Sequence, residues 1–159
     1  MWDGGSPLHS LGGLDRTLRM SDEHPNIGDP LEPLEKTTQM ARLREITRPF
    51  LSTAISDAAP IACRVNGVET PFKDFPDLLP GHTAILACFE NYDYVARTTW
   101  AAFVHFFENR APWEDFDVCV FSDIGEWCVA INHNGHACLV GDRNLANPSC
   151  NTDALTRAG

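Results

Sequence analysis

Three short apolar runs in the last third of the chain constrain the fold more than any other feature. The runs DVCVFS, EWCVAIN and HACLVG each have the length of a strand and are rich in valine, cysteine and aromatic residues. Turn residues separate them, first Asp123-Ile124-Gly125 and then Asn134-Gly135. Consecutive strands with short connections pair with their neighbours. The pattern therefore predicts a three-stranded antiparallel meander.

The second of these turns also predicts a register. Asn-Gly supplies the two positive-φ residues of a type I′ hairpin turn. A two-residue turn at this position makes His133 and His136 direct cross-strand partners. Deeper in the same two strands, this register aligns Ile131 with Cys138 and Val129 with Val140.

A similar dipeptide, Asn66-Gly67, lies in the segment IACRVNGVETPF. It predicts an earlier hairpin with its own type I′ turn. In that register Arg64 stands opposite Glu69, a favourable cross-strand charge pair.

Residues 82–90, with the sequence HTAILACFE, predict a buried strand. Asn91 or Asp93 is then expected to cap a helix. Apolar side chains recur at helical spacing along that helix, which indicates a central core element; they are Ala96, Trp100, Phe103, Val104 and Phe107.

The first third of the chain divides into two kinds of sequence. Residues 1–33 are rich in Gly, Pro, Ser and Asp without a sustained period, which is typical of an extended arm, flexible or docked. From residue 34 the apolar residues follow helical spacing. Pro49 should end or kink that helix near Thr47, because its ring clashes with the preceding turn.

These elements predict an α+β fold. We expect a mainly antiparallel sheet made of an N-terminal hairpin, a central strand and the C-terminal three-strand meander. Two or three helices should pack on one face of this sheet. Residues 34–159 then form a single globular domain, preceded by the arm of residues 1–33.

Charge narrows the classes of function. The 159 residues include 12 Lys and Arg against 22 Asp and Glu, a formal net charge of −10. This argues against a nucleic acid or an anionic membrane as the partner, because both are bound by clustered cations.

No apolar run reaches the roughly 18 residues of a membrane span, and no secretory signal pattern is visible. Six cysteines, mostly in strand-like apolar runs, predict free thiols and a cytoplasmic location.

The sequence offers one metal-like group, His133 and His136 with Cys138. A structural zinc site takes four ligands, and only three are local here, so we expect a hydrogen-bonded turn and neither a metal nor another cofactor. No nucleophile elbow, phosphate loop or dinucleotide fingerprint occurs. We therefore expect no catalytic residues.

Acidic residues are concentrated in residues 112–141, which contain no Lys or Arg. A field of one sign suits capture of a basic partner. Trp113 is the expected apolar anchor, with Phe116 and Trp127 as alternatives. The predicted partner-binding residues are Trp113, Glu114, Asp115, Asp117, Asp123 and Glu126.

In size, charge and helix-then-meander layout, the chain is similar to the small immunity proteins of bacterial toxin systems and to phage-encoded inhibitors. This likeness implies an acidic protein-binding module that covers the nucleic-acid-binding site of a partner such as a nuclease or toxin. Two alternatives stay open. One is a small enzyme or metal-binding protein that uses His133, His136 and Cys138. The other is an assembly component whose arm, residues 1–33, wraps a neighbour. The oligomeric state is left open.

Overall fold

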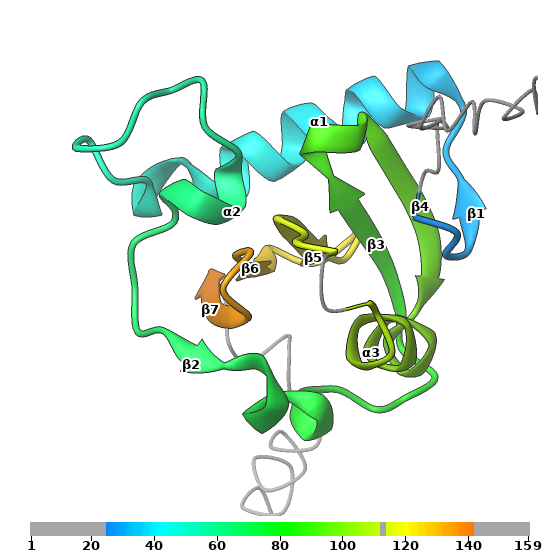
Figure 1. Cartoon of the computed structure of the whole chain (residues 1–159). Helices are drawn as coiled ribbons and strands as arrows, with labels where there is room; N and C mark the ends of the chain where they lie inside the picture. The colour runs from blue at the N-terminus through cyan, green and yellow to red at the C-terminus, as the bar shows by residue number, and fades with distance from the viewer. Residues whose placement is uncertain (1–24, 112–113, 142–159) are drawn as a thin grey trace, which may run out of the picture.

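The computed structural model describes residues 25–111 and 114–141. Within these ranges, seven strands form one sheet in the order β1-β4-β3-β5-β6-β7-β2, and every neighbouring pair is antiparallel. Figure 1 shows the sheet between its helices. The strands are β1 (Asp29–Pro30), β2 (Thr70–Pro71), β3 (Ala84–Phe89), β4 (Tyr94–Thr99), β5 (Val118–Phe121), β6 (Trp127–Ile131) and β7 (His136–Gly141).

The α+β class is confirmed, but the helices lie on both faces of the sheet. Helices α1 (Pro33–Thr47) and α2 (Ile61–Arg64) cover one face, and α3 (Trp100–Glu108) covers the other (Figure 1). The expectation of helices on one face was wrong. Helices are needed on both faces because the central strands β5 and β6 are buried at every position. A strand buried throughout needs cover on both sides.

The two faces carry separate apolar cores. Under α3, the aromatic side chains of Trp100, Phe103 and Phe107 pack with Val118 and Val120, as the helical spacing predicts. Three-ten turns at Phe72–Asp74 and Pro76–Leu78 complete this side, with Phe72 edge-on to the α3 rings.

On the opposite face, Leu43 of α1 and Ile61 of α2 are buried. The side chains that they meet come from alternate positions of the strands, and four of them are cysteines: Cys88, Cys119, Cys128 and Cys138. Together with Cys63, these thiols are free. Cys150 lies outside the described residues.

The predicted hairpin at Asn66-Gly67 is wrong. Residues 61–64 instead form α2, whose first N–H is bonded by the Glu90 carboxylate. The backbone that follows pairs with residues 50–52, through Ser52 N to Arg64 O and Asn66 N to Phe50 O, both at 2.7 Å. Arg64 consequently pairs with Asp57 rather than with Glu69.

The helix expected after residue 91 begins later. A 3-10 turn over Glu90–Tyr92 and Asp93 at φ 49° reverse the chain, so that residues 94–99 return as β4 beside β3. Ala96 therefore belongs to a strand, and Thr99 caps α3 by accepting from Ala102 N at 3.3 Å.

The meander forms as predicted, with a one-residue difference in register. Ile131 pairs with Ala137 and Ala130 with Cys138, and Asn132 N donates to His136 O. The loop thus holds three residues, closed by Gly135 N to Asn132 O with Gly135 at φ 75°. This arrangement matches the three-residue hairpin loop with an αL glycine. His133 and His136 are therefore not partners.

The N-terminal helix ends as predicted. α1 reaches Thr47, and a 3-10 turn over Arg48–Phe50 carries Pro49. The described end of the arm docks onto the sheet, because β1 pairs with β4 and Tyr94 Oη donates to Ile27 O at 3.0 Å. Among the described residues, no helix combines the length and the apolar character needed to cross a membrane.

Candidate functional site

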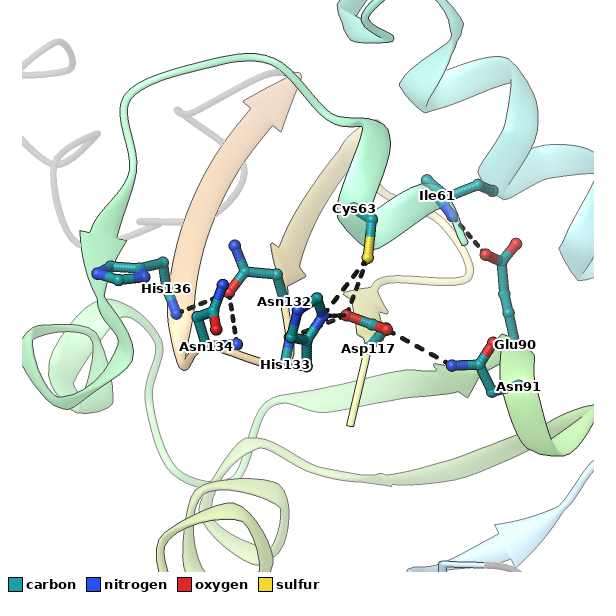
Figure 2. Close-up of polar contacts among 9 residues, drawn as sticks. All are labelled: Ile61, Cys63, Glu90, Asn91, Asp117, Asn132, His133, Asn134 and His136. Atoms are coloured by element: carbon teal, nitrogen blue, oxygen red, sulfur yellow. Dashed lines mark hydrogen bonds and ion pairs between the residues drawn. The ribbon is translucent and has the colours of Figure 1, made fainter. Parts of the chain in front are cut away.

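The densest group of chemically versatile side chains lies at one end of the sheet. Asp117 immediately precedes β5, His133 lies in the β6–β7 loop, and Cys63 is on α2 (Figure 2). We call these three residues the Cys-Asp-His cluster. Each of the three residues offers one atom that can ligate a metal ion, and these atoms all lie within 4.8 Å of one another. Among the described residues, no other three His, Cys, Asp or Glu side chains are grouped in this way.

One carboxylate oxygen is the centre of the cluster. Asp117 Oδ1 accepts from His133 N at 2.8 Å and from Cys63 Sγ at 3.0 Å, and it lies 3.0 Å from His133 Nδ1. Asn91 Nδ2 donates to the second carboxylate oxygen at 3.5 Å. These donors from separate segments hold the nearly buried carboxylate in one orientation.

Local structure explains how Cys63 comes to this position. Pro60 precedes α2, and the carboxylate of Glu90, the first residue after β3, accepts from the Ile61 N–H at the start of the helix (Figure 2). Ile61 itself is buried. Cys63 comes two residues after Ile61 in the same helical turn, and its side chain points toward Asp117 and away from the core that Ile61 enters (Figure 2).

The cluster is poorly arranged for nucleophilic catalysis. An activated cysteine needs a neighbouring base or cation that favours its thiolate. Here the thiol donates to a carboxylate, and Sγ lies 3.9 Å from His133 Nδ1. Burial, the hydrogen bond to Asp117 and the negative charges of Asp117 and Glu90 raise the pKa of Cys63 to about 12. A thiolate is therefore rare at neutral pH.

The structure separates the metal-like group that the sequence suggested. His133 joins Asp117 and Cys63, whereas His136 is exposed and lies on the far side of Asn132 and Asn134 (Figure 2). Cys138 is buried in the core under α1 and α2. The one-residue change of register is the physical reason.

The structure places the predicted acidic residues at both ends of β5. Asp117 precedes β5 and Asp123 follows it, so more than about 13 Å of strand separates them. Glu114 is half-buried and accepts from Ala111 N at 2.7 Å, while Asp115 and Glu126 are exposed. Asp123 pairs with Arg97 at 2.6 Å.

The apolar anchors are placed as follows. Trp113, the expected anchor, lies outside the described residues. Phe116 and Trp127 are buried in the core under α3 and are not available to a partner. The sequence pattern alone could not tell whether these two aromatic side chains are buried or exposed.

A second surface feature is the turn between β5 and β6, which we call the Ser122–Glu126 turn. The Arg42 guanidinium donates to two of its backbone carbonyls, Ser122 O and Gly125 O. Ser122 Oγ accepts from the N–H groups of Ile124 and Gly125 at 3.2 and 3.1 Å. These contacts brace the turn, yet the Ile124 side chain is 89% exposed at its tip.

Beside this turn is a surface pocket of about 440 Å³. Two carboxylates, Glu45 and Glu126, line it together with Ile46, Pro49, Phe50 and Gly141, and with Arg42, whose guanidinium is held by the carbonyls of the turn. Sequence analysis included Glu126 but missed Glu45, because the two residues are 81 positions apart and only the fold brings them together.

Comparison of the chain with known protein families, with curated proteins and with solved structures gives no match.

Proposed function

We propose that this protein is an acidic protein-binding module, an inhibitor or immunity-type protein that covers a basic site of a partner protein. The observation that carries the proposal is the Ser122–Glu126 turn. Ile124 is 89% exposed at the tip of a turn that Arg42 braces, beside a pocket lined by two carboxylates, and this combination offers a partner both an apolar contact and negative charge. A rigid turn also loses little conformational entropy when it binds.

The adjacent pocket supports a cationic partner. Its apolar lining suits the aliphatic stem of an arginine or lysine, and Glu45 and Glu126 can pair with the charged end. The one cation of the lining, Arg42, is outnumbered by these two carboxylates and is engaged by Ser122 O and Gly125 O. Within the described residues, neither carboxylate makes an ion pair. Both are therefore open to a basic group, whereas Asp123 already binds Arg97.

The formal net charge of −10 supports the same assignment. A field of one sign accelerates the encounter with a basic surface, while an apolar anchor chiefly slows dissociation. The two parts of the surface should therefore be separable in kinetic measurements.

The test begins with a photo-crosslinking amino acid placed at Ile124 in the full chain, expressed in cells of its source. Val68 serves as the matched control position, because its side chain is 77% exposed but follows α2, outside the Ser122–Glu126 turn. We expect one basic protein to be crosslinked from position 124 and not from position 68.

Binding kinetics with that protein then test the mechanism. Glu45→Gln/Glu126→Gln should slow association severalfold and weaken its salt dependence, because screening acts on these charges. Ile124→Ser should mainly speed dissociation, and Val68→Ser should behave as wild type. Equal association rates of wild type and the double variant at every salt concentration would refute the proposal.

A further inference from the structure

We propose that the Cys-Asp-His cluster binds a divalent transition-metal ion, with zinc as the best fit. The donors would be Cys63 Sγ, one carboxylate oxygen of Asp117 and His133 Nδ1. A thiolate, an imidazole nitrogen and a carboxylate oxygen are all ligands of Zn²⁺ in proteins, whereas Mg²⁺ and Ca²⁺ take oxygen ligands. This site differs from the combination of His133, His136 and Cys138, of which it shares only one residue.

The spacing of the donor atoms fits a tetrahedral ion. Metal bonds of about 2.3 Å to sulfur and about 2.0 Å to nitrogen and oxygen place sulfur about 3.5 Å from the other two donors, and nitrogen about 3.3 Å from oxygen. The corresponding distances in the structure are 3.9 Å for Sγ to Nδ1, 3.0 Å for Sγ to Oδ1 and 3.0 Å for Nδ1 to Oδ1. The differences from the tetrahedral values are about 0.4, 0.5 and 0.3 Å, which small side-chain rotations can supply.

Binding also balances in protons and charge. The ion replaces the Cys63 S–H proton, which passes to solvent, and the His133 ring gives up the Nδ1 proton that faces Asp117 and takes one from solvent on Nε2, so that the ring stays neutral. One thiolate and one carboxylate then neutralise the two positive charges of the ion. Asp117 keeps its hydrogen bond from His133 N, at 2.8 Å, which holds the carboxylate in place.

The exposure of the ligands indicates an open site. The Asp117 side chain is only 9% exposed at the base, while the His133 side chain is 50% exposed at the mouth. An ion can therefore enter from solvent. Three protein ligands leave one tetrahedral position for water or an external ligand, as in open zinc sites and unlike closed structural ones.

The experiment uses the full chain after removal of metal with a chelator. Titration with Zn²⁺ alone, monitored by calorimetry, should give a stoichiometry of one ion per chain. Elemental analysis of the zinc-loaded protein after desalting should give the same ratio. Substitution with Co²⁺ should add a near-ultraviolet thiolate-to-metal absorption band together with the visible bands of a four-coordinate ion. Absence of the thiolate band would overturn the assignment of Cys63 as a ligand.

Three single variants separate this site from other binding. His133→Ala and Cys63→Ser should each weaken Zn²⁺ binding by at least about 100-fold, the upper range for loss of an outer-shell partner. His136→Ala is the matched control, an exposed histidine on the same hairpin, and should bind as wild type. Circular dichroism checks that each variant folds, and the two ligand variants report independently if one does not.

Two outcomes would overturn the proposal. The first is Zn²⁺ binding that is substoichiometric or unchanged in both His133→Ala and Cys63→Ser. The second is loss of binding in His136→Ala, which would return the site to the hairpin residues. Neither outcome bears on the Ser122–Glu126 turn, so the proposed function is tested separately.

Discussion

Asp117 shows how strongly one residue can depend on parts of the chain that are distant in sequence. Its Oδ1 contacts the backbone and ring of His133 and the thiol of Cys63, which are 16 and 54 positions away. By sequence it belongs to an acidic, cation-free stretch, which predicts a solvated surface charge. The fold instead makes it a nearly buried acceptor. Burial is the largest cause of the raised pKa of Cys63, and the hydrogen bond and negative charge of Asp117 raise it further.

The first consequence concerns the reactivity of that thiol in metal-free protein. The pKa of Cys63, raised to about 12 from an ordinary 9.0, leaves about 1,000-fold less thiolate at pH 8. The greater nucleophilicity of a more basic thiolate restores about 20-fold. We therefore expect Cys63 to react with iodoacetamide roughly 50-fold more slowly than an unperturbed thiol.

Site-resolved mass spectrometry across a pH series measures this rate. The rate should keep rising beyond pH 9, because the thiol titrates only near its raised pKa. Asp117→Asn removes the negative charge and leaves only a weaker, neutral amide acceptor, so it should lower the pKa of Cys63 and speed the reaction. The urea-unfolded chain provides the unperturbed reference. A rate that levels off near pH 9 in the folded wild type would contradict the expectation.

Among the elements, those with a continuous apolar run were predictable from sequence. β3, β5, β6 and β7 lie where such runs predict strands, and α3 contains the predicted aromatic stripe. Their burial is decided by their own side chains, which is information that a local pattern holds. The start of α1 near residue 34 and its end at Thr47 were also predictable, because proline acts locally.

The failures occur where distant contacts decide the structure. Asn66-Gly67 has ideal hairpin chemistry, yet residues 50–52 pair with the adjacent backbone and Glu90 caps α2. The Cys-Asp-His cluster was not predictable for the same reason, since it needs α2 and the true β6–β7 register. Only His133 and Asp117 were singled out by sequence, each for a different role.

The start of α3 offers a test at the level of an element. Thr99 Oγ1 accepts from Ala102 N and thus satisfies one of the free donors at the helix N-terminus. Thr99→Ala should lower the free energy of unfolding by about 1 kcal/mol. Thr99→Ser keeps the hydroxyl and is the matched control, expected to stay close to wild type. Urea denaturation of the three proteins provides the measurement, and equal midpoints for wild type and Thr99→Ala would argue against this cap.

The whole molecule is organised by one sheet that carries a core on each face. The α3 side contains most of the aromatic residues, and the α1–α2 side contains aliphatic residues and cysteines. Neighbouring residues of one strand contribute to different cores; in β5, for example, Val118 faces α3 and Cys119 faces α1 and α2. Neither core can therefore come apart without disturbing the strands on which the other depends. The Cys-Asp-His cluster and the Ser122–Glu126 turn, the two proposed binding surfaces, lie at the two ends of β5, so both rest on this shared sheet.

This organisation predicts that both cores unfold in one cooperative transition. Ile61→Val removes a methyl group from the α1–α2 core, and Ile131→Val removes one from the α3 core; both side chains are fully buried. Each variant should lose about 0.5–1.5 kcal/mol of unfolding free energy, and the double variant about the sum, because the sheet separates the sites. With Trp2 and Trp113 replaced by phenylalanine in every protein compared, tryptophan fluorescence reports the α3 side through Trp100 and Trp127, while far-ultraviolet circular dichroism reports the whole chain. Val68→Ala at an exposed position is the control and should stay within about 0.5 kcal/mol of wild type. If Ile61→Val shifted the circular dichroism transition but left the fluorescence transition in place, the two cores would be independent and a shared sheet would not couple them.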